Sequence, residues 1–340
     1  MYRHLLVPVD GTGLSTETVG QAVEFARTLG ARVTFFFAAP DHERSLTGEA
    51  EVVWNTSPNE FVYAFEGRAR ELLAKAESAA RALGVPCSSI SAVSDKPYEA
   101  ILAAARTAGC DLIFMASHGR RSTVGMMLGS QTLKVLMQTA IPVLVAATSN
   151  PAAPARAIGI IRDEHRSLAA VLHAWMHMLA AARKEGKQPD RALMRAMVRY
   201  IKDFPLALHH PKEDDHLFSR LRERTSAVDA ELDELQRQHE RDHQMVAELS
   251  ALVDSDRADL AALDEAVGRY ARFLWDHMGR EEGVILPAAQ KYLRAEDWAA
   301  IDAAFAANND PRFGADTDLQ YKRLFSRIVN LAAPAASAAR

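Results

Sequence analysis

The chain has 340 residues, of which 49% are hydrophobic and 25% are charged, and its formal net charge is −4. This length suits two domains, and the composition is that of a globular protein able to bury a sizeable core. The charge gives no case for nucleic acid or an anionic membrane as a partner, and no apolar run reaches the length of a membrane span.

The N-terminal residues and the two cysteines point to one compartment. The chain enters an apolar run at once, without the anatomy of a signal peptide. Cys87 and Cys110 lie among apolar or small residues, which favours two buried free thiols over a disulfide. We therefore expect a protein of the reducing cytoplasm.

Short apolar runs alternate with helical periodicity in the first 147 residues. Strands that are apolar throughout and alternate with helices predict an α/β fold, a doubly wound parallel sheet of five strands covered on both faces. The predicted strands are 4–10, 33–38, 88–93, 111–116 and 142–146, and the predicted helices are 15–29, 60–83, 98–108 and 131–138.

Two loops follow carboxyl ends of predicted strands, where such sheets bind ligands. One is Pro8–Gly11, and the other runs from Ala116 through Gly119 and Gly129 to Ser130. Glycines there let the backbone approach phosphate oxygens, and a helix beginning near Ser130 offers free N–H groups to an anion. The Ser130 hydroxyl can bind a phosphate or cap the helix, and both interpretations stay open.

A second interpretation of the first loop is a dinucleotide fingerprint, because Gly11 and Gly13 are spaced as its first two glycines. Thr16 stands where the third glycine is needed, so this match is weak.

The longer loop resembles the universal stress protein family, whose nucleotide-binding members carry Gly-x2-Gly-x9-Gly-Ser/Thr. Here the pattern is Ala116-x2-Gly119-x9-Gly129-Ser130, so an alanine replaces the first glycine, and Asp10 ends the first strand. The resemblance covers 1–147 and implies a site for ATP or another adenine nucleotide, and a homodimer formed through this domain. It assigns to the nucleotide Pro8, Val9, Asp10, Ala38, Met115, Ala116, His118, Gly119, Gly129, Ser130, Gln131 and Thr132.

Strand patterns end at a small, proline-bearing linker, 148–156. Helical periodicity then predicts an all-α antiparallel four-helix bundle over 157–300, with Pro205 and Pro211 interrupting its second helix. We expect a helical extension at 301–332 and a disordered tail at 333–340. The predicted bundle helices are 158–184, 190–223, 226–253 and 258–291.

Nine of the twelve histidines lie between 165 and 277. Three segments there place two metal-competent side chains four residues apart, which puts them on one helix face. Five imidazoles and two carboxylates without a thiolate form a nitrogen and oxygen ligand field suited to iron. Seven ligands are too many for one tetrahedral zinc, but they suit two metals that share bridges.

This set resembles the hemerythrin-like, HHE cation-binding family, with His, His-x3-Glu, His-x3-His and His-x3-Glu on successive helices. The resemblance implies a non-haem di-iron site with an oxo or hydroxo bridge, and Glu213 and Glu281 as bridging carboxylates. One iron would keep an open position for O2, peroxide or NO. The implied metal ligands are His165, His209, Glu213, His239, His243, His277 and Glu281.

Two alternatives concern these histidines. His210 adjoins His209 and precedes a proline that kinks the helix, so His210 is either an alternative ligand or a side chain that supports the ligands. His239-Glu240-x-x-His243 also matches a short zinc-protease motif with Glu240 as the base. That interpretation leaves two His-x3-Glu pairs unexplained.

The sequence therefore predicts a cytoplasmic stress or redox-response protein. It binds adenine nucleotide in the first domain and O2 or a related small ligand at iron in the second. We expect a binding or sensing protein more than an enzyme. The alternative is a di-iron enzyme, either an oxidase or one that reduces peroxide or NO.

Overall fold

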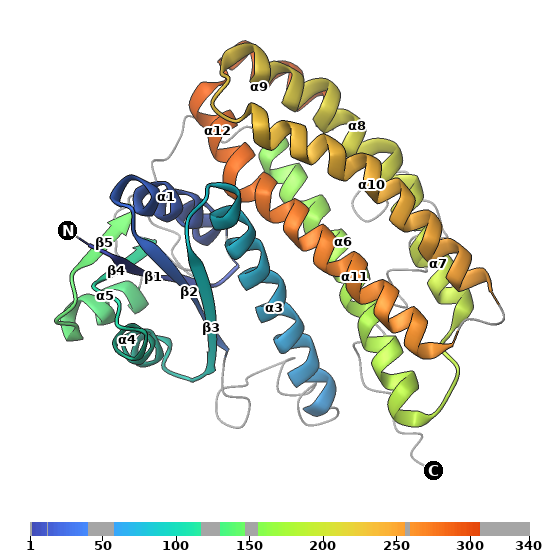
Figure 1. Cartoon of the computed structure of the whole chain (residues 1–340), viewed down its shortest axis with the longest axis horizontal. Coiled ribbons are helices and arrows are strands. Elements are labelled where there is room, and N and C mark those ends of the chain that lie inside the picture. The colour runs from blue at the N-terminus through green and yellow to red at the C-terminus, as the bar shows by residue number, and fades with distance from the viewer. Residues whose placement is uncertain are drawn as a thin grey trace. The chain divides into compact units, whose positions relative to one another are not determined.

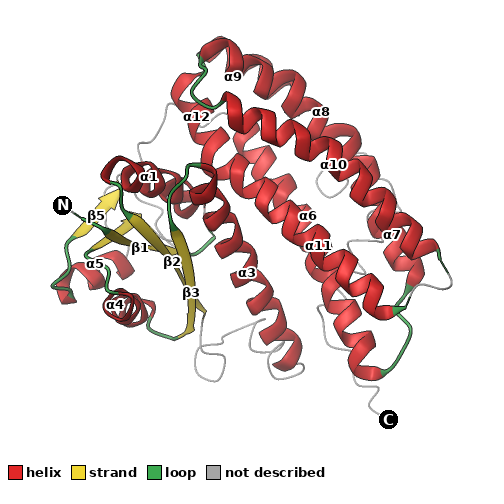
Figure 2. Ribbon diagram, viewed as in Figure 1, coloured by secondary structure: helices red, strands yellow, loops and turns green. Residues whose placement is uncertain are grey.

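The computed structural model describes residues 2–11, 13–39, 58–116, 130–146, 156–255 and 259–306. The chain forms an α/β part and a part made of helices alone (Figures 1 and 2). Residues 148–155 of the predicted linker lie outside the described residues, and so do residues 307–340. Among the described residues, no helix combines the length and the apolar character that crossing a membrane requires.

The α/β part is built on five parallel strands in the order β3-β2-β1-β4-β5. The predicted fold class is thereby confirmed. β1 and β4 are neighbours, but the chain continues from β1 toward one edge of the sheet and from β4 toward the other. Sheets of this kind bind ligands at the point between two such strands. The strands are β1 (His4–Val9), β2 (Arg32–Ala39), β3 (Cys87–Val93), β4 (Leu112–Ala116) and β5 (Val143–Ala146).

Both faces of this sheet are covered because its strands are apolar on both sides. Leu5, Val7 and Val9 of β1 pack with buried residues of two helices, whereas Leu6 packs on the opposite face with two others. The alternation of side chains along a strand produces this division. The helices are α1 (Gly13–Leu29) and α3 (Pro58–Ala82) on the first face, and α4 (Pro97–Ala108) and α5 (Ser130–Gln138) on the second.

The turn after β1 requires a glycine. Gly11 has φ 74°, and a Cβ there would lie 2.9 Å from side-chain atoms of Arg68 and Leu72 on α3. A side chain would therefore meet both backbone strain and a steric clash. Cys87 and Cys110 are free thiols, as predicted, but Cys87 is half-buried and only Cys110 is buried. Burial raises the pKa of the Cys110 thiol to about 11.

Each predicted helix of the second part is present. Gly186, with φ 63°, follows the first helix, and the Asp190 side chain caps the next by accepting the N–H of Leu193 at 2.9 Å. Trp175, Tyr200 and Tyr270 are fully buried in the core. The helices are α6 (Arg156–Glu185), α7 (Arg191–Ile201), α8 (His210–Lys212), α9 (Ser219–Arg224), α10 (Asp229–Asp254), α11 (Leu260–Arg280), α12 (Leu286–Tyr292) and α13 (Ala295–Ala306).

Three segments between these helices are π-helical: η1 (Lys202–His209), η2 (Glu213–Phe218) and η3 (Glu281–Ile285). A π-helix bonds each N–H to the carbonyl five residues earlier, and it is rare. Because the segments continue the neighbouring helices, α7 to α9 form one long rod, and so do α11 and α12 (Figure 1).

Ion pairs of Arg224 link α9 to α13. Arg224 donates two hydrogen bonds of 2.8 Å to the Asp297 carboxylate, which also accepts the N–H of Arg294 at 2.9 Å. The Arg224 guanidinium holds the pKa of Asp297 down, to about 2.

We expect Asp297→Asn to lower the free energy of unfolding by about 1–2 kcal/mol at pH 7, since a charge-assisted pair is lost. The difference from the unmodified protein should shrink as pH falls from about 4 to about 2, because the unfolded carboxyl is protonated near its usual pKa. Urea denaturation across this pH range measures it. Asp254→Asn, which breaks the exposed Arg195 pair, is the control. A difference that stays constant with pH would contradict this account.

Candidate functional sites

Three of the predicted metal ligands lie where helices widen into π-helical turns. η1 ends at His209, η2 begins at Glu213, and η3 begins at Glu281. In the first of these turns the N–H of His210 donates to the carbonyl of Pro205, five residues earlier. Pro205 and Pro211 lack an N–H, so the regular four-residue pattern cannot run through this stretch. The two prolines therefore break the regular helical pattern at His209 and Glu213.

The widened turn brings two adjacent histidines into the interior. His209 and His210 are each 3% exposed, although neighbouring residues of a regular α-helix point about 100° apart. Their ring centroids are 5.6 Å apart. His210 also stacks on His239 of α10, with centroids 4.2 Å apart. Both histidines therefore face other predicted ligands.

The structure gathers the metal-competent side chains into two buried clusters. Within each cluster the ligand atoms lie within 4.8 Å of one another. The first cluster is His165, His209, Glu213 and Glu281, and the second cluster is His210, Glu213, His239 and His277.

Glu213 belongs to both clusters and presents a different oxygen to each. Its Oε1 lies 3.2 Å from His209 Nε2 in the first cluster, and its Oε2 lies 3.6 Å from His239 Nε2 in the second. On α11 and η3, His277 Nε2 lies 3.5 Å from Glu281 Oε1. One carboxylate thus stands between two sets of imidazoles, which is the arrangement that a bridging ligand needs.

Carboxylates outside the clusters orient the histidines. Glu164 Oε2 lies 2.6 Å from His209 Nδ1, and Asp214 Oδ2 lies 2.9 Å from His239 Nδ1. When Nδ1 carries the proton in such a pair, Nε2 is left with its lone pair toward the cluster. Sequence reasoning missed both Glu164 and Asp214. The signal for both was their place beside a predicted ligand, Glu164 before His165 and Asp214 after Glu213.

The donor set fits two metal cations. Five imidazoles and two carboxylates without a thiolate suit iron, and every member is at most 5% exposed. Burial lowers the pKa of His209, but the Glu213 and Glu164 carboxylates outweigh it and raise that pKa well above the usual value. Without a metal, a proton on His209 balances the negative charge of these carboxylates, whereas a bound dication would balance it in the metal form. The clusters therefore have the charge, burial and donors that a cation requires.

His243 lies apart from this arrangement. Its side chain is exposed on α10 and belongs to neither cluster, whereas His210 occupies a place in the second cluster. Glu240 is exposed as well, so the zinc-protease motif does not bring its residues to one site. The π-helical turn brings His210 inward, whereas the regular helix α10 buries His239 and exposes His243. The structure thus brings together six of the seven predicted ligands and His210.

The predicted nucleotide residues that the structure describes lie at carboxyl ends of strands. Val9 ends β1 and Asp10 follows it, Ala38 lies near the end of β2, and Met115 and Ala116 end β4. Pro8 lies on β1. His118, Gly119 and Gly129 lie outside the described residues, and the side chain of Ser130, the first residue of α5, is not described.

Two further predicted nucleotide residues hold the start of α5 against β4 and α4. The Thr132 hydroxyl donates to the carbonyl of Ala116 at 3.0 Å, and the Gln131 side chain accepts the N–H of Tyr98 at 3.2 Å. The first bond fixes the start of α5 beside the end of β4, and the second fixes it beside the start of α4. Residues that the prediction assigns to the nucleotide therefore lie at these strand ends and at the start of α5.

Comparison with known proteins identifies both parts. Residues 1–147 match the universal stress protein family, and residues 156–289 match the hemerythrin HHE cation binding domain. The two predicted family resemblances are thereby confirmed, whereas the ligand residues stay predictions. No curated protein matches the chain.

Solved structures similar to the chain include several universal stress proteins. One from Burkholderia pseudomallei shares 22% identity over 43% of this chain and 97% of its own, with a TM-score of 0.35. One from Archaeoglobus fulgidus in complex with dAMP shares 21% identity over 42% of this chain and 97% of its own, with a TM-score of 0.31. A third universal stress protein, in complex with cAMP, shares 23% identity over 44% of this chain and 98% of its own, with a TM-score of 0.31.

We expect His210→Ala to lose metal and His243→Ala to keep it, because only His210 lies in a cluster. Removing one ligand from a metal site usually costs at least tenfold in affinity, since even supporting residues cost about 10- to 100-fold. Metal content per chain after dialysis, measured by mass spectrometry, separates the two variants. Metal loss in His243→Ala with full retention in His210→Ala would restore the arrangement predicted from the sequence.

Proposed function

Because the chain joins a universal stress protein domain to a hemerythrin HHE cation binding domain, we propose that it is a stress or redox-response protein with a di-iron centre. The centre binds O2 or a related small ligand such as NO or peroxide. The observation that carries the proposal is the position of Glu213, which offers one oxygen to each of two imidazole clusters.

The ligand count supports binding of a small molecule from outside the protein. Each cluster supplies four side chains, which is fewer than the six positions of an octahedral metal. The clusters also differ, because the first has two imidazoles and the second has three. Iron, when bound, supplies redox-active positions that diatomic molecules and peroxide can occupy.

The surroundings of the clusters favour retention of a bound small molecule over its reaction with water. Phe305 meets His209 edge to face with centroids 6.3 Å apart, and Phe218 lies parallel to His239 at 5.8 Å. Both phenylalanines are fully buried. The phenylalanine rings exclude water from the imidazoles. The Glu164 and Asp214 carboxylates hold the imidazole rings of His209 and His239 in place.

We also infer that the first domain binds an adenine nucleotide at the carboxyl ends of β1, β2 and β4. Support comes from the family, and from the neighbouring positions of β1 and β4, where the chain connections diverge. In this proposal Asp10 accepts a hydrogen bond from the adenine amino group. The first domain also forms the homodimer that the sequence predicts.

The iron centre is tested by loading the purified chain with ferrous iron under argon and then admitting O2 or NO. We expect two irons per chain and an absorption change that reverses when the gas is removed. Glu213→Ala should hold close to no iron, since it removes a ligand from both clusters. Glu240→Ala, which changes an exposed glutamate on α10, should hold two.

Turnover separates binding from catalysis in the same sample. Reversible spectra without consumption of peroxide or NO support the binding protein, and sustained consumption that Glu213→Ala abolishes would favour the di-iron enzyme instead. One iron per chain in the unmodified protein would contradict both.

Nucleotide binding is tested by calorimetry with ATP, dAMP and cAMP. We expect Asp10→Ala to weaken binding by about tenfold, which corresponds to one hydrogen bond to a charged group. Glu24→Ala, an exposed change on α1, is the matched control. Equal affinity in all three proteins would exclude Asp10 from the site.

A further inference from the structure

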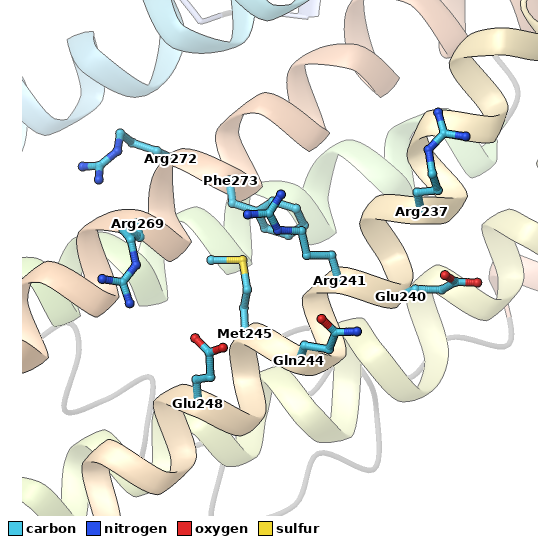
Figure 3. Close-up of a pocket in the computed structure, with 9 residues that line it drawn as sticks. All are labelled: Arg237, Glu240, Arg241, Gln244, Met245, Glu248, Arg269, Arg272 and Phe273. Atoms are coloured by element: carbon cyan, nitrogen blue, oxygen red, sulfur yellow. The ribbon is translucent and has the colours of Figure 1, made fainter.

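A groove with a volume of about 720 Å³ runs along the outer face of α10 and α11 (Figure 3). Four arginines line it, and Met245 and Phe273 lie between the two helices. We call this the arginine groove. Its arginines are Arg237 and Arg241 on α10, and Arg269 and Arg272 on α11.

The arginine groove is separate from the metal clusters. On α10 the groove residues Arg237, Arg241 and Met245 recur every fourth residue on an outward stripe, whereas His239 is buried on the other side. On α11 the groove residues Arg269 and Arg272 are exposed, whereas His277 is buried. The two helices that supply His239 and His277 thus carry a second set of polar side chains on their outer faces.

The groove carries an excess of positive charge. Four guanidiniums face two carboxylates, Glu240 and Glu248, so its formal charge is +2. Arg237 and Arg269 each pair with a glutamate of their own helix, at 2.8 Å in both cases. Arg241 and Arg272 make no hydrogen bond or ion pair with any residue that the structure describes. Two guanidiniums are therefore available to an anion.

We propose that the arginine groove binds an organic phosphate, a small molecule that joins an aromatic group to one or more phosphates. Guanidinium groups match the geometry of phosphate oxygens, because their planar donors bind two oxygens at once. Phe273 and Met245 offer the aromatic group an apolar floor between the helices. A volume of about 720 Å³ fits a molecule of this size and is larger than inorganic phosphate requires.

The test uses the full chain and 1-naphthyl phosphate as the probe, with binding followed by calorimetry. We expect 1-naphthyl phosphate to bind more tightly than inorganic phosphate, and 1-naphthol to bind weakest of the three. Arg241→Gln with Arg272→Gln should weaken the phosphate ester by at least about tenfold. The matched control, Arg195→Gln with Arg222→Gln, removes two arginines that pair with exposed aspartates elsewhere on the bundle.

Glu248→Gln tests the same site in the opposite direction. It removes a negative charge from the groove, so the phosphate ester should bind about twofold to fivefold more tightly. Glu223→Gln, an exposed change on α9, should leave the affinity unchanged.

Three results would overturn the proposal. They are no binding of the phosphate ester, equal weakening by the two arginine pairs, and unchanged affinity in both the groove pair and Glu248→Gln. The equal-weakening result would mean diffuse attraction to a charged surface. Asp10→Ala in the same titration separates the groove from the first domain, because it should leave binding at the groove intact.

Discussion

The arrangement of the helical part depends on one carboxylate. Glu213 is 1% exposed, and its two oxygens face the Nε2 atoms of His209 and His239, which belong to different clusters. An isolated buried carboxylate is costly unless charge and hydrogen bonds compensate it. Imidazoles from α6, from the rod α7 to α9, from α10 and from α11 surround Glu213 and Glu281. This arrangement gives a site that can bind cations. The core of this part is thus organised around a charge that only binding partners of opposite charge can balance.

Holding that carboxylate between two imidazole sets requires an irregular helix. A regular α-helix presents residues i and i+4 on one face, which would bring in His209 and Glu213 and turn His210 aside. The π-helical turns at η1 and η2, linked to the two prolines of this stretch, bring both histidines inward. Such turns are frequent at functional sites. The surrounding helices and the Glu164 and Asp214 carboxylates then fix the rings.

The regular elements could be predicted because their causes are local. Apolar runs define the strands, periodicity defines the helices, and both survive into the structure within a few residues at each end. The inward position of His210 could not be predicted, because counting by four assumes regular helix geometry. Pro205 and Pro211 did mark this helix as the place where that assumption fails. The predicted phosphate loop, 117–129, lies outside the described residues, so its part of the nucleotide site stays a prediction.

The most direct test of the shared carboxylate is anomalous diffraction at the iron edge from crystals of the iron-loaded chain. The account predicts two peaks, one beside His165 and His209 and the other beside His210, His239 and His277, with an oxygen of Glu213 at each. A single peak, or a peak beside His243 with His210 turned away, would contradict it.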